Sequence, residues 1–213
     1  MKILFPSIEK LARLEVAELT LSRGERSLIS ELSLTLTPGD VLWTQGDNGI
    51  GKTTFLEALA GIRRPDDGHV KWIESGKAVQ PMSVIAYQPH KSFAKGALTA
   101  KEDLTFWAKL HKTTTLTTDA LDYVGLKRQT QIAAQSLSAG QRRRLALAKL
   151  IISQKPIWIM DEPDAAMDNT GVLLIDDLIS QHVARGGIAI IASHDTTRKL
   201  STHTRRLTLE AAA

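Results

Sequence analysis

Residues 46–54 of this 213-residue chain read GDNGIGKTT and place three glycines in front of a lysine and two threonines. Glycine adopts conformations that turn successive backbone N–H groups toward one point, so such a loop forms a cradle for phosphate. Lys52 would place its positive charge on the outer phosphates of a nucleotide, and the hydroxyl of Thr53 is a suitable Mg²⁺ ligand. The spacing G-x-x-x-x-G-K-T, between an expected strand and an expected helix, predicts binding of a nucleoside triphosphate. The predicted nucleotide-binding residues are Gly46, Asp47, Asn48, Gly49, Ile50, Gly51, Lys52, Thr53 and Thr54.

Two adjacent carboxylates form a second candidate element. The run PIWIMDE at residues 156–162 is apolar until it ends in Asp161 and Glu162. Asp161 is expected to hold Mg²⁺ through water, and Glu162 to polarise an attacking water as a general base. Taken alone, the pair also fits two charges favoured by a helix dipole. A phosphate loop in the same chain favours the catalytic interpretation, so the two elements together predict a Mg²⁺-dependent nucleoside triphosphatase.

A second possible anion site lies at residues 136–150, SLSAGQRRRLALAKL. A polar loop with Ser138 and Gly140 runs directly into an expected helix, and a helix N-terminus after such a loop attracts anions. One phosphate cradle is already present upstream, so this second one needs an explanation. The three arginines 142–144 are interpreted as solvated or interface-lining residues, with the leucines of the same helix on its packed side.

The strands expected around these motifs belong to two kinds of sheet. Residues 12–21 and 31–37 alternate apolar and polar residues, which predicts antiparallel strands with one solvated face. Other runs are continuously apolar, as in a parallel sheet covered on both faces. Strand–helix–strand alternation indicates an α/β fold with a parallel sheet. The apolar runs are 41–45, 83–88, 156–162 and 187–194.

Helices are expected at 52–61, within 99–150 and at about 171–184. The first places Phe55, Leu56, Leu59 and Ala60 on one face and ends at Gly61. Thr99 and Thr118 are expected to cap the helices of the middle region.

Composition excludes several classes of protein. The formal net charge is +4, which is too small to indicate nucleic-acid binding by itself. The chain has no cysteine, so a disulfide framework, a thiolate metal site and a cysteine nucleophile are excluded. The apolar runs fall short of the roughly 20 residues that a membrane span needs. We therefore expect contact with a membrane only through partners, and no nucleic-acid partner.

These motifs, with three others in the expected order, resemble the ATP-binding cassette (ABC) ATPases along essentially the whole chain. Leu137–Gln141 resembles the family's signature loop, Gln88 the Q-loop glutamine, Asp168 the D-loop aspartate and His194 the switch histidine. The resemblance implies a P-loop NTPase fold: a RecA-like parallel sheet with an N-terminal antiparallel β subdomain and a helical subdomain. It implies ATP as the nucleotide, with Thr53, Gln88 and Asp161 around Mg²⁺.

The same resemblance explains the second anion site. Cassettes of this family pair head to tail, and the signature loop of one closes on the ATP held by the other. It implies a homodimer in which Ser138, Ala139, Gly140 and Gln141 contact the partner's nucleotide. His194 would act beside Glu162 in catalysis.

The chain departs from the family where many cassettes stack adenine on an aromatic residue. The corresponding region, LTLSRGERSL, has none, and Arg23 or Arg26 would have to stack by guanidinium instead. The sequence therefore leaves open whether the site prefers ATP or GTP.

Within the family, the chain resembles the ATP-binding subunits of bacterial cytochrome c maturation systems, which are haem exporter ATPases. The resemblance implies integral membrane subunits as partners and a position at the cytoplasmic face of the inner membrane. It also implies a role in haem export or in release of a haem-loaded periplasmic chaperone. The alternatives are another small ABC exporter and a soluble cassette acting on ribosomes or DNA. No haem site is visible, and the other histidines are interpreted as structural: His69, His90, His111, His182 and His203.

Residues 1–213 are expected to form one ABC domain. Its core would comprise about 13–88 and 151–210, its helical subdomain about 89–150. The extension 1–12 is interpreted as a frayed extension or as a result of start-site choice, with an amphipathic segment touching a membrane or partner as the alternative.

Overall fold

The computed structural model describes residues 5–8, 10, 12–90, 97–193 and 204–209. The chain divides into two compact units, each considered by itself. We call residues 7–90, 155–162 and 179–213 the sheet unit, and residues 1–6, 91–154 and 163–178 the helical unit. The division into core and helical subdomain drawn from the sequence stays a prediction.

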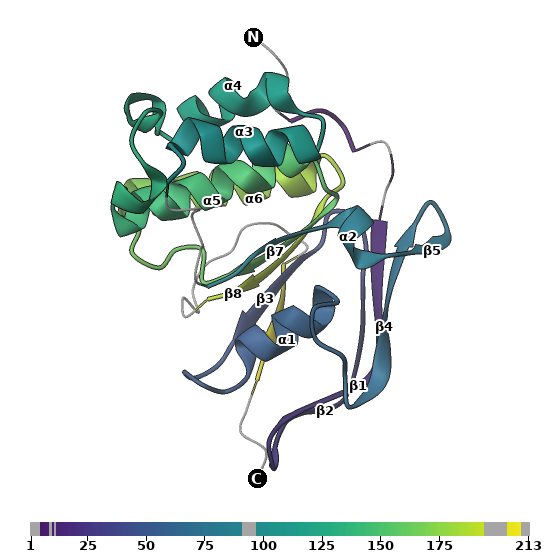
Figure 1. The fold of residues 1–213 in the computed structure, drawn as a ribbon. Coiled ribbons are helices and arrows are strands. Elements are labelled where there is room, and N and C mark those ends of the chain that lie inside the picture. The colour runs from purple at the N-terminus through teal and green to yellow at the C-terminus, as the bar shows by residue number, and fades with distance from the viewer. Residues whose placement is uncertain (1–4, 9, 11, 91–96, 194–203, 210–213) are drawn as a thin grey trace. The chain divides into compact units, whose positions relative to one another are not determined.

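The sheet unit contains a five-stranded parallel sheet in the order β6-β7-β8-β3-β9 (Figure 1). Strands β7 and β8 are buried at every residue, as their apolar sequences require. The carboxyl ends of parallel strands lie along one edge, so β3, β6 and β7 deliver the residues that follow them to the same edge. The bounds are β3 Val41–Gln45, β6 Ile85–Gln88, β7 Ile157–Asp161, β8 Ile188–Ala192 and β9 Thr204–Thr208.

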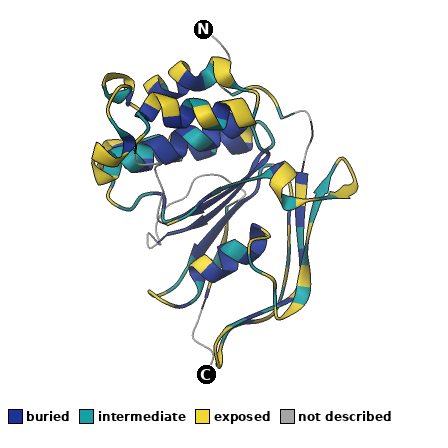
Figure 2. Cartoon of the chain, in the orientation of Figure 1, coloured by how far each residue is buried: buried dark blue, intermediate teal, exposed yellow. Residues whose placement is uncertain are grey.

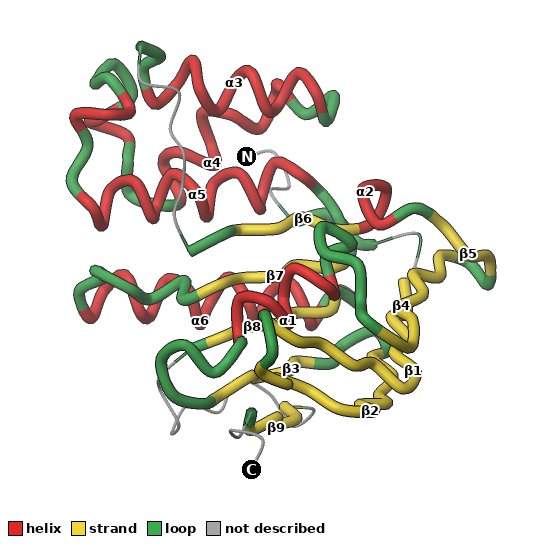
Figure 3. Tube along the Cα trace, turned by 60° about the horizontal axis from the view of Figure 1, so that its bottom comes forward, coloured by secondary structure: helices red, strands yellow, loops and turns green. Residues whose placement is uncertain are grey.

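The same unit contains an antiparallel sheet in the order β2-β1-β4-β5. β1 and β2 form a long hairpin (Figure 3) that turns at Gly24, whose φ of 63° suits glycine. The sequence predicted shorter strands in this hairpin and did not predict β4 or β5. The bounds are β1 Ala12–Arg23, β2 Arg26–Leu36, β4 Asp67–Glu74 and β5 Lys77–Val79.

Helix α1, Lys52–Leu59, joins the two sheets in one core. Phe55, Leu56 and Leu59 are fully buried in the cluster that also takes apolar residues from β1, β2, β3, β7 and β8. Figure 2 shows the buried strands and the buried side of α1 in dark blue. Gly61 follows the helix with φ of 71°, which confirms the predicted end. A short helix α2 spans Pro81–Val84.

The helical unit packs α3, α4 and α5 together (Figure 1). Thr99 caps α3 in a capping box with Glu102, as predicted. The prediction for Thr118 was wrong, because α4 begins at Thr117 and continues from a 3₁₀ turn whose Thr114 carbonyl accepts the Thr117 hydroxyl. The bounds are α3 Ala100–Leu110, α4 Thr117–Tyr123, α5 Ala139–Ser153, with 3₁₀ turns Thr114–Leu116, Lys127–Gln129 and Ala134–Ser136. Helix α6, Asn169–Ala184, begins in this unit and ends in the sheet unit.

None of the helices formed by the described residues is both long enough and apolar enough to cross a bilayer.

Candidate active site: a phosphate loop beside two carboxylates

The glycine loop after β3 requires glycine for backbone reasons. Gly46, Gly49 and Gly51 have φ of 142°, 77° and 117°, where other residues are strained. At Gly46 a Cβ would lie 2.7 Å from the Leu209 carbonyl oxygen, and at Gly51 one would lie 3.0 Å from Leu28 Cδ1. The loop therefore has the glycine-dependent geometry that the sequence predicted for a phosphate cradle.

Lys52 lies across this loop. The residue is only 6% exposed, and Nζ donates to the carbonyl oxygens of Gly46 at 2.6 Å and Asp47 at 3.1 Å. These backbone carbonyls thus compensate the charge of the buried ammonium. A phosphate in the cradle would offer this cation a stronger, charged acceptor.

Thr53 and Asp161 meet although 108 residues separate them in sequence, with the Thr53 hydroxyl donating to Asp161 Oδ2 at 2.7 Å. Asp161 is 1% exposed at the end of β7. The described residues contain no group of three or more histidine or acidic side chains arranged to hold a metal. Two hard oxygen donors with few further protein ligands suit Mg²⁺, which keeps several waters and binds substrate phosphates. The donor set therefore fits Mg²⁺.

Gln88 ends β6 as a buried amide. It is 2% exposed, and neither Oε1 nor Nε2 has a hydrogen-bond partner in the part of the chain that the structure describes. Its strand neighbour is Met160, directly before Asp161. An unsatisfied buried amide costs about 1–3 kcal/mol, so Gln88 is poised for a polar ligand at this edge of the sheet.

Glu162 follows Asp161 with φ of 48°, in the left-handed region, and its backbone N–H donates to Ala192 O at 2.9 Å. The backbone is thereby tied to the end of β8. Its Oε2 lies 3.1 Å from Nδ1 of His90, a histidine that was interpreted from the sequence as structural. The register of β6 against β7, in which Gln88 pairs with Met160, is the signal that connects the two residues.

Arg26 borders a hollow of about 430 Å³ beside the glycine loop. It stands at the start of β2, opposite Arg23 across the hairpin turn, and Arg23 does not line the hollow. Of the two arginines considered for stacking on a base, the structure places Arg26 next to the phosphate cradle. The hollow is lined by Arg26, Gly46, Asp47, Asn48, Ile50, Thr208 and Leu209.

The signature-like loop in the helical unit forms the N-terminus of α5. The Ser138 hydroxyl accepts from the Gln141 backbone N–H at 3.2 Å, and the Gln141 side chain accepts from the Ser138 N–H at 2.9 Å. Ser138 and Ala139 are exposed. A Cβ on Gly140 would lie 3.1 Å from the Ala166 carbonyl oxygen, so this helix start packs against the segment after Pro163.

Asp168 caps the start of α6. Its Oδ1 accepts from the Gly171 backbone N–H at 2.8 Å and from the Thr170 hydroxyl at 2.9 Å, and these bonds lower the pKa of its carboxyl. Arg144 Nη2 lies 3.3 Å from the same oxygen and ties α5 to this cap.

The arginine run 142–144 is more engaged than the sequence suggested. The interpretation as a solvated or interface-lining run is wrong for Arg143, which is 8% exposed. Arg142 donates to the Leu137 carbonyl and Arg144 to the Val124 carbonyl, so both hold the helical unit together. The leucines Leu145, Leu147 and Leu150 are buried, as predicted.

His194 and His203 lie outside the described residues. The described strand β8 ends at Ala192, and Ser193 donates its backbone N–H to Thr44 O at 3.2 Å.

A family model described as "ABC transporter" matches residues 29–165. Three relatives are each named cytochrome c biogenesis ATP-binding export protein CcmA. That of Rhodobacter capsulatus is 41% identical and the match covers 85% of this chain and 80% of the relative. Those of Haemophilus influenzae and Photobacterium profundum are each 38% identical, covering 93% and 92% of this chain and 96% and 99% of the relatives.

Solved structures share the fold at low identity. A putative ABC transporter ATP-binding protein from Pyrococcus furiosus has a TM-score of 0.77 at 21% identity, covering 92% of this chain and 97% of that one. The ATP-binding cassette MJ0796, solved as a dimer in a post-hydrolysis state with ADP and Pi, has a TM-score of 0.75 at 20% identity. That match covers 85% of this chain and 88% of the cassette.

Proposed function

The chain belongs to the ABC transporter family and is an ABC-type ATPase, and on that premise we propose that it is the ATP-hydrolysing subunit of an export complex in cytochrome c biogenesis. One observation carries the assignment within the family. Relatives named for this process are 38–41% identical over 80–99% of their length, rather than over the shared motifs alone.

Binding of ATP would use the glycine loop and Lys52. The backbone N–H groups of the loop cradle the phosphates, and the Lys52 ammonium exchanges the Gly46 and Asp47 carbonyls for phosphate oxygens. Thr53 and Asp161 would hold Mg²⁺, which when bound supplies charge neutralisation on the outer phosphates. The buried amide of Gln88 is a further polar group that this edge offers to the nucleotide and its metal.

Hydrolysis would use Glu162 as the general base. Its carboxylate would accept a proton from the attacking water as the water oxygen bonds to the γ-phosphorus. The bond from the γ-phosphorus to the β-phosphate oxygen would break in line, so that ADP is the leaving group and inorganic phosphate is formed. The left-handed backbone and the hydrogen bond to Ala192 O hold Glu162 at the sheet edge. His194, which follows β8 in the sequence, is proposed as the second catalytic residue beside Glu162.

Closure of two copies head to tail would supply the rest of the site. The exposed N-terminus of α5, with Ser138, Ala139, Gly140 and Gln141, would reach the partner's ATP, and Asp168 would act at the same interface. The capping box keeps the Ser138 hydroxyl at the helix start, where the helix dipole favours an anion.

The proposed partners are integral membrane subunits of the same export complex, which place the chain peripherally at the cytoplasmic face of the bacterial inner membrane. The proposed output is haem export or release of the haem-loaded periplasmic chaperone. Support comes from the names of the relatives and from the role of cassettes as subunits of transporters.

A capture experiment tests this function. Tagged Glu162→Gln protein, purified from native membranes in ATP, should retain its ATP-locked partners, because the amide cannot act as a base. Tagged Lys52→Ala protein is the matched control that should not lock. Haem-handling membrane subunits in the eluate, with a haem absorbance spectrum, are expected. A different permease pair without haem would reject the cytochrome c assignment, and recovery of ribosomes would reject the transport assignment.

A further inference from the structure

His90 lies two residues after Gln88, just beyond the end of β6, and brings an imidazole to the candidate active site. Its Nδ1 lies 3.1 Å from Glu162 Oε2. A carboxylate only accepts hydrogen bonds, so the imidazole must carry its proton on Nδ1 in this contact. His90 is 47% exposed at its side chain, and Glu162 is 19% exposed.

The contact is built by the strand register. Gln88 pairs with Met160 in the parallel pair β6–β7. His90 and Glu162 each follow by two residues, so the register brings them opposite one another at strands spaced about 4.8 Å apart.

Proline between Gln88 and His90 stiffens this arrangement. Pro89 has a fixed φ and restricts Gln88 to extended conformations. Glu162 is held from the other side, because its backbone N–H bonds to Ala192 O. Both partners are therefore anchored through the backbone of a buried sheet.

We propose that His90 is a positioning residue that orients the carboxylate of Glu162 for catalysis by donating a hydrogen bond from Nδ1 to Oε2. The proposal rests on the proposed role of Glu162 as general base. A base is commonly oriented by a third group that hydrogen-bonds to it and leaves another lone pair for the proton to be moved. One donor occupies a small part of the accepting capacity of a carboxylate, so Glu162 retains lone pairs for the attacking water.

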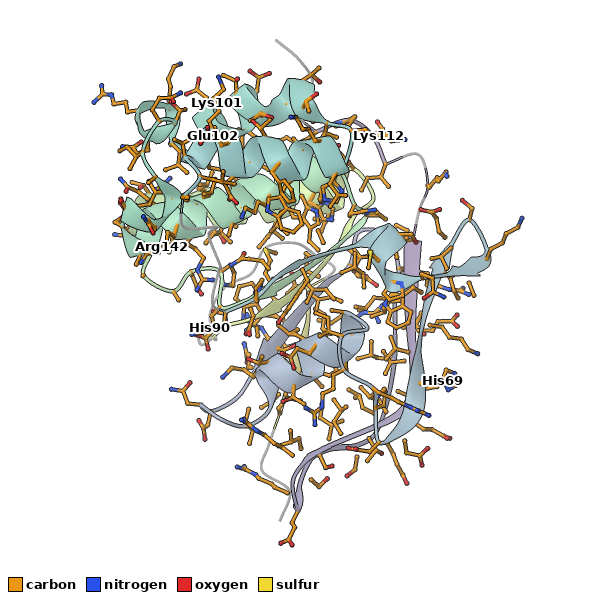
Figure 4. The ribbon with its side chains drawn as sticks, in the orientation of Figure 1. His69, His90, Lys101, Glu102, Lys112 and Arg142 are labelled. Carbon is orange, nitrogen blue, oxygen red and sulfur yellow. The ribbon has the colours of Figure 1, made fainter. Side chains whose placement is uncertain are left out.

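The test compares two variants of nearly the same shape. His90→Asn keeps an N–H donor on Cγ, where Nδ1 stands in histidine, and His90→Leu has a similar outline without a donor. His69→Ala is the control for loss of a histidine, since His69 is exposed on β4 and lies well away from His90 in the same unit (Figure 4). The full chain is purified with its copurifying partners, and kcat, KM and ATP affinity are measured.

We expect His90→Leu to lower kcat about 10- to 100-fold, the size of effect that a misplaced catalytic group produces, with KM and ATP affinity within twofold of wild type. His90→Asn should recover most of the rate, and His69→Ala should be unchanged. In a Glu162→Gln background, His90→Leu should cause no further loss, because the group on which it acts is already gone.

Four results would overturn the positioning role: wild-type or faster turnover in His90→Leu, equal loss in the Asn and Leu variants, a rise in KM in place of the fall in kcat, or a further loss in the Glu162→Gln background. The Glu162→Gln variant alone separates this proposal from the function on which it rests. Full ATPase activity in Glu162→Gln rejects Glu162 as the base. Slow turnover in Glu162→Gln together with wild-type turnover in His90→Leu rejects only the role of His90.

Discussion

His182 should make the sheet unit sensitive to acid, although it takes no part in the site. Its ring is fully buried and stacks on Trp158 with centroids 3.9 Å apart and planes 7° apart. Nε2 lies 3.1 Å from Pro156 O and 3.3 Å from Ile188 O, so it must carry the proton, and Nδ1 accepts from Arg185 Nη2 at 3.1 Å. Both ring nitrogens are thus satisfied only in the neutral ring.

Protonation is therefore costly in the folded state. Burial, together with the nearby charge of Arg185, lowers the pKa of His182 from an ordinary value of 6.5 to about 3. The unfolded chain then binds more protons between these two values. Stability contributed by this residue is complete above pH 6.5 and is lost as the pH falls toward 3.

Linkage gives the size of the effect. Between pH 7.5 and pH 5, a folded pKa of about 3 against 6.5 unfolded costs about 2 kcal/mol of unfolding free energy, and by pH 3 it costs about 4 kcal/mol. His182→Phe keeps a ring on Trp158 but cannot titrate. Its stability at pH 7.5 should fall by roughly 1–3 kcal/mol, because a buried hydrogen bond is lost, while its decline to pH 5 should be about 2 kcal/mol smaller than that of wild type.

Urea unfolding at several pH values, followed by tryptophan fluorescence, measures this difference. A Trp107→Phe background leaves Trp43, Trp72 and Trp158, which all lie in the sheet unit. His69→Phe, at an exposed histidine, is the control and should keep the wild-type pH dependence. Equal acid destabilisation of wild type and His182→Phe would refute the reasoning.

Three further changes probe the nucleotide site. Lys52→Ala should weaken ATP binding at least tenfold in a fluorescent-nucleotide titration, because a charge-assisted phosphate contact is removed, and unchanged affinity would count against the phosphate-loop assignment. Gly46→Ala should lower the free energy of unfolding in urea more than Gly49→Ala does. Backbone strain at positive φ costs about 1–3 kcal/mol at either position, but only the Cβ at Gly46 would also meet backbone, 2.7 Å from Leu209 O. Similar losses for both would reject the steric argument. Arg26→Ala should weaken ATP and GTP binding alike by a few-fold if guanidinium stacking replaces an aromatic, and unchanged affinity for both would exclude Arg26 from the base site.

The parallel sheet and its motif residues were predictable because their signals are local. The run 156–162 and the glycine loop each indicate their structure within ten residues of sequence. The meeting of Thr53 and Asp161 follows once both segments are placed at the carboxyl edge of one sheet.

Strands β4 and β5 were missed for a physical reason. β4 reads DGHVKWIE, in which the exposed titratable residues Asp67, His69 and Lys71 alternate with residues that are only half-buried. Its stability as a strand comes from pairing with β1, whose residues lie about fifty positions earlier, and no local pattern records that pairing.

The contact between His90 and Glu162 could not be predicted from the sequence for the same kind of reason. Its partner Glu162 is 72 residues away, and nothing near His90 distinguishes it from a surface histidine. Only the register of β6 against β7 connects the two. Gln88 was recognised by its place in the order of motifs, whereas its unsatisfied buried amide is visible only in the structure.

The central claim is that this chain hydrolyses ATP through Glu162 for an export step in cytochrome c biogenesis. The most direct measurement is the content of c-type cytochromes, detected by haem staining, in native cells that lack the chain. The same cells are compared after complementation with the wild-type chain and with Glu162→Gln. We expect loss of c-type cytochromes in the cells without the chain, restoration by wild type and no restoration by an equally expressed Glu162→Gln. Normal cytochromes without the chain, or full restoration by Glu162→Gln, would contradict it.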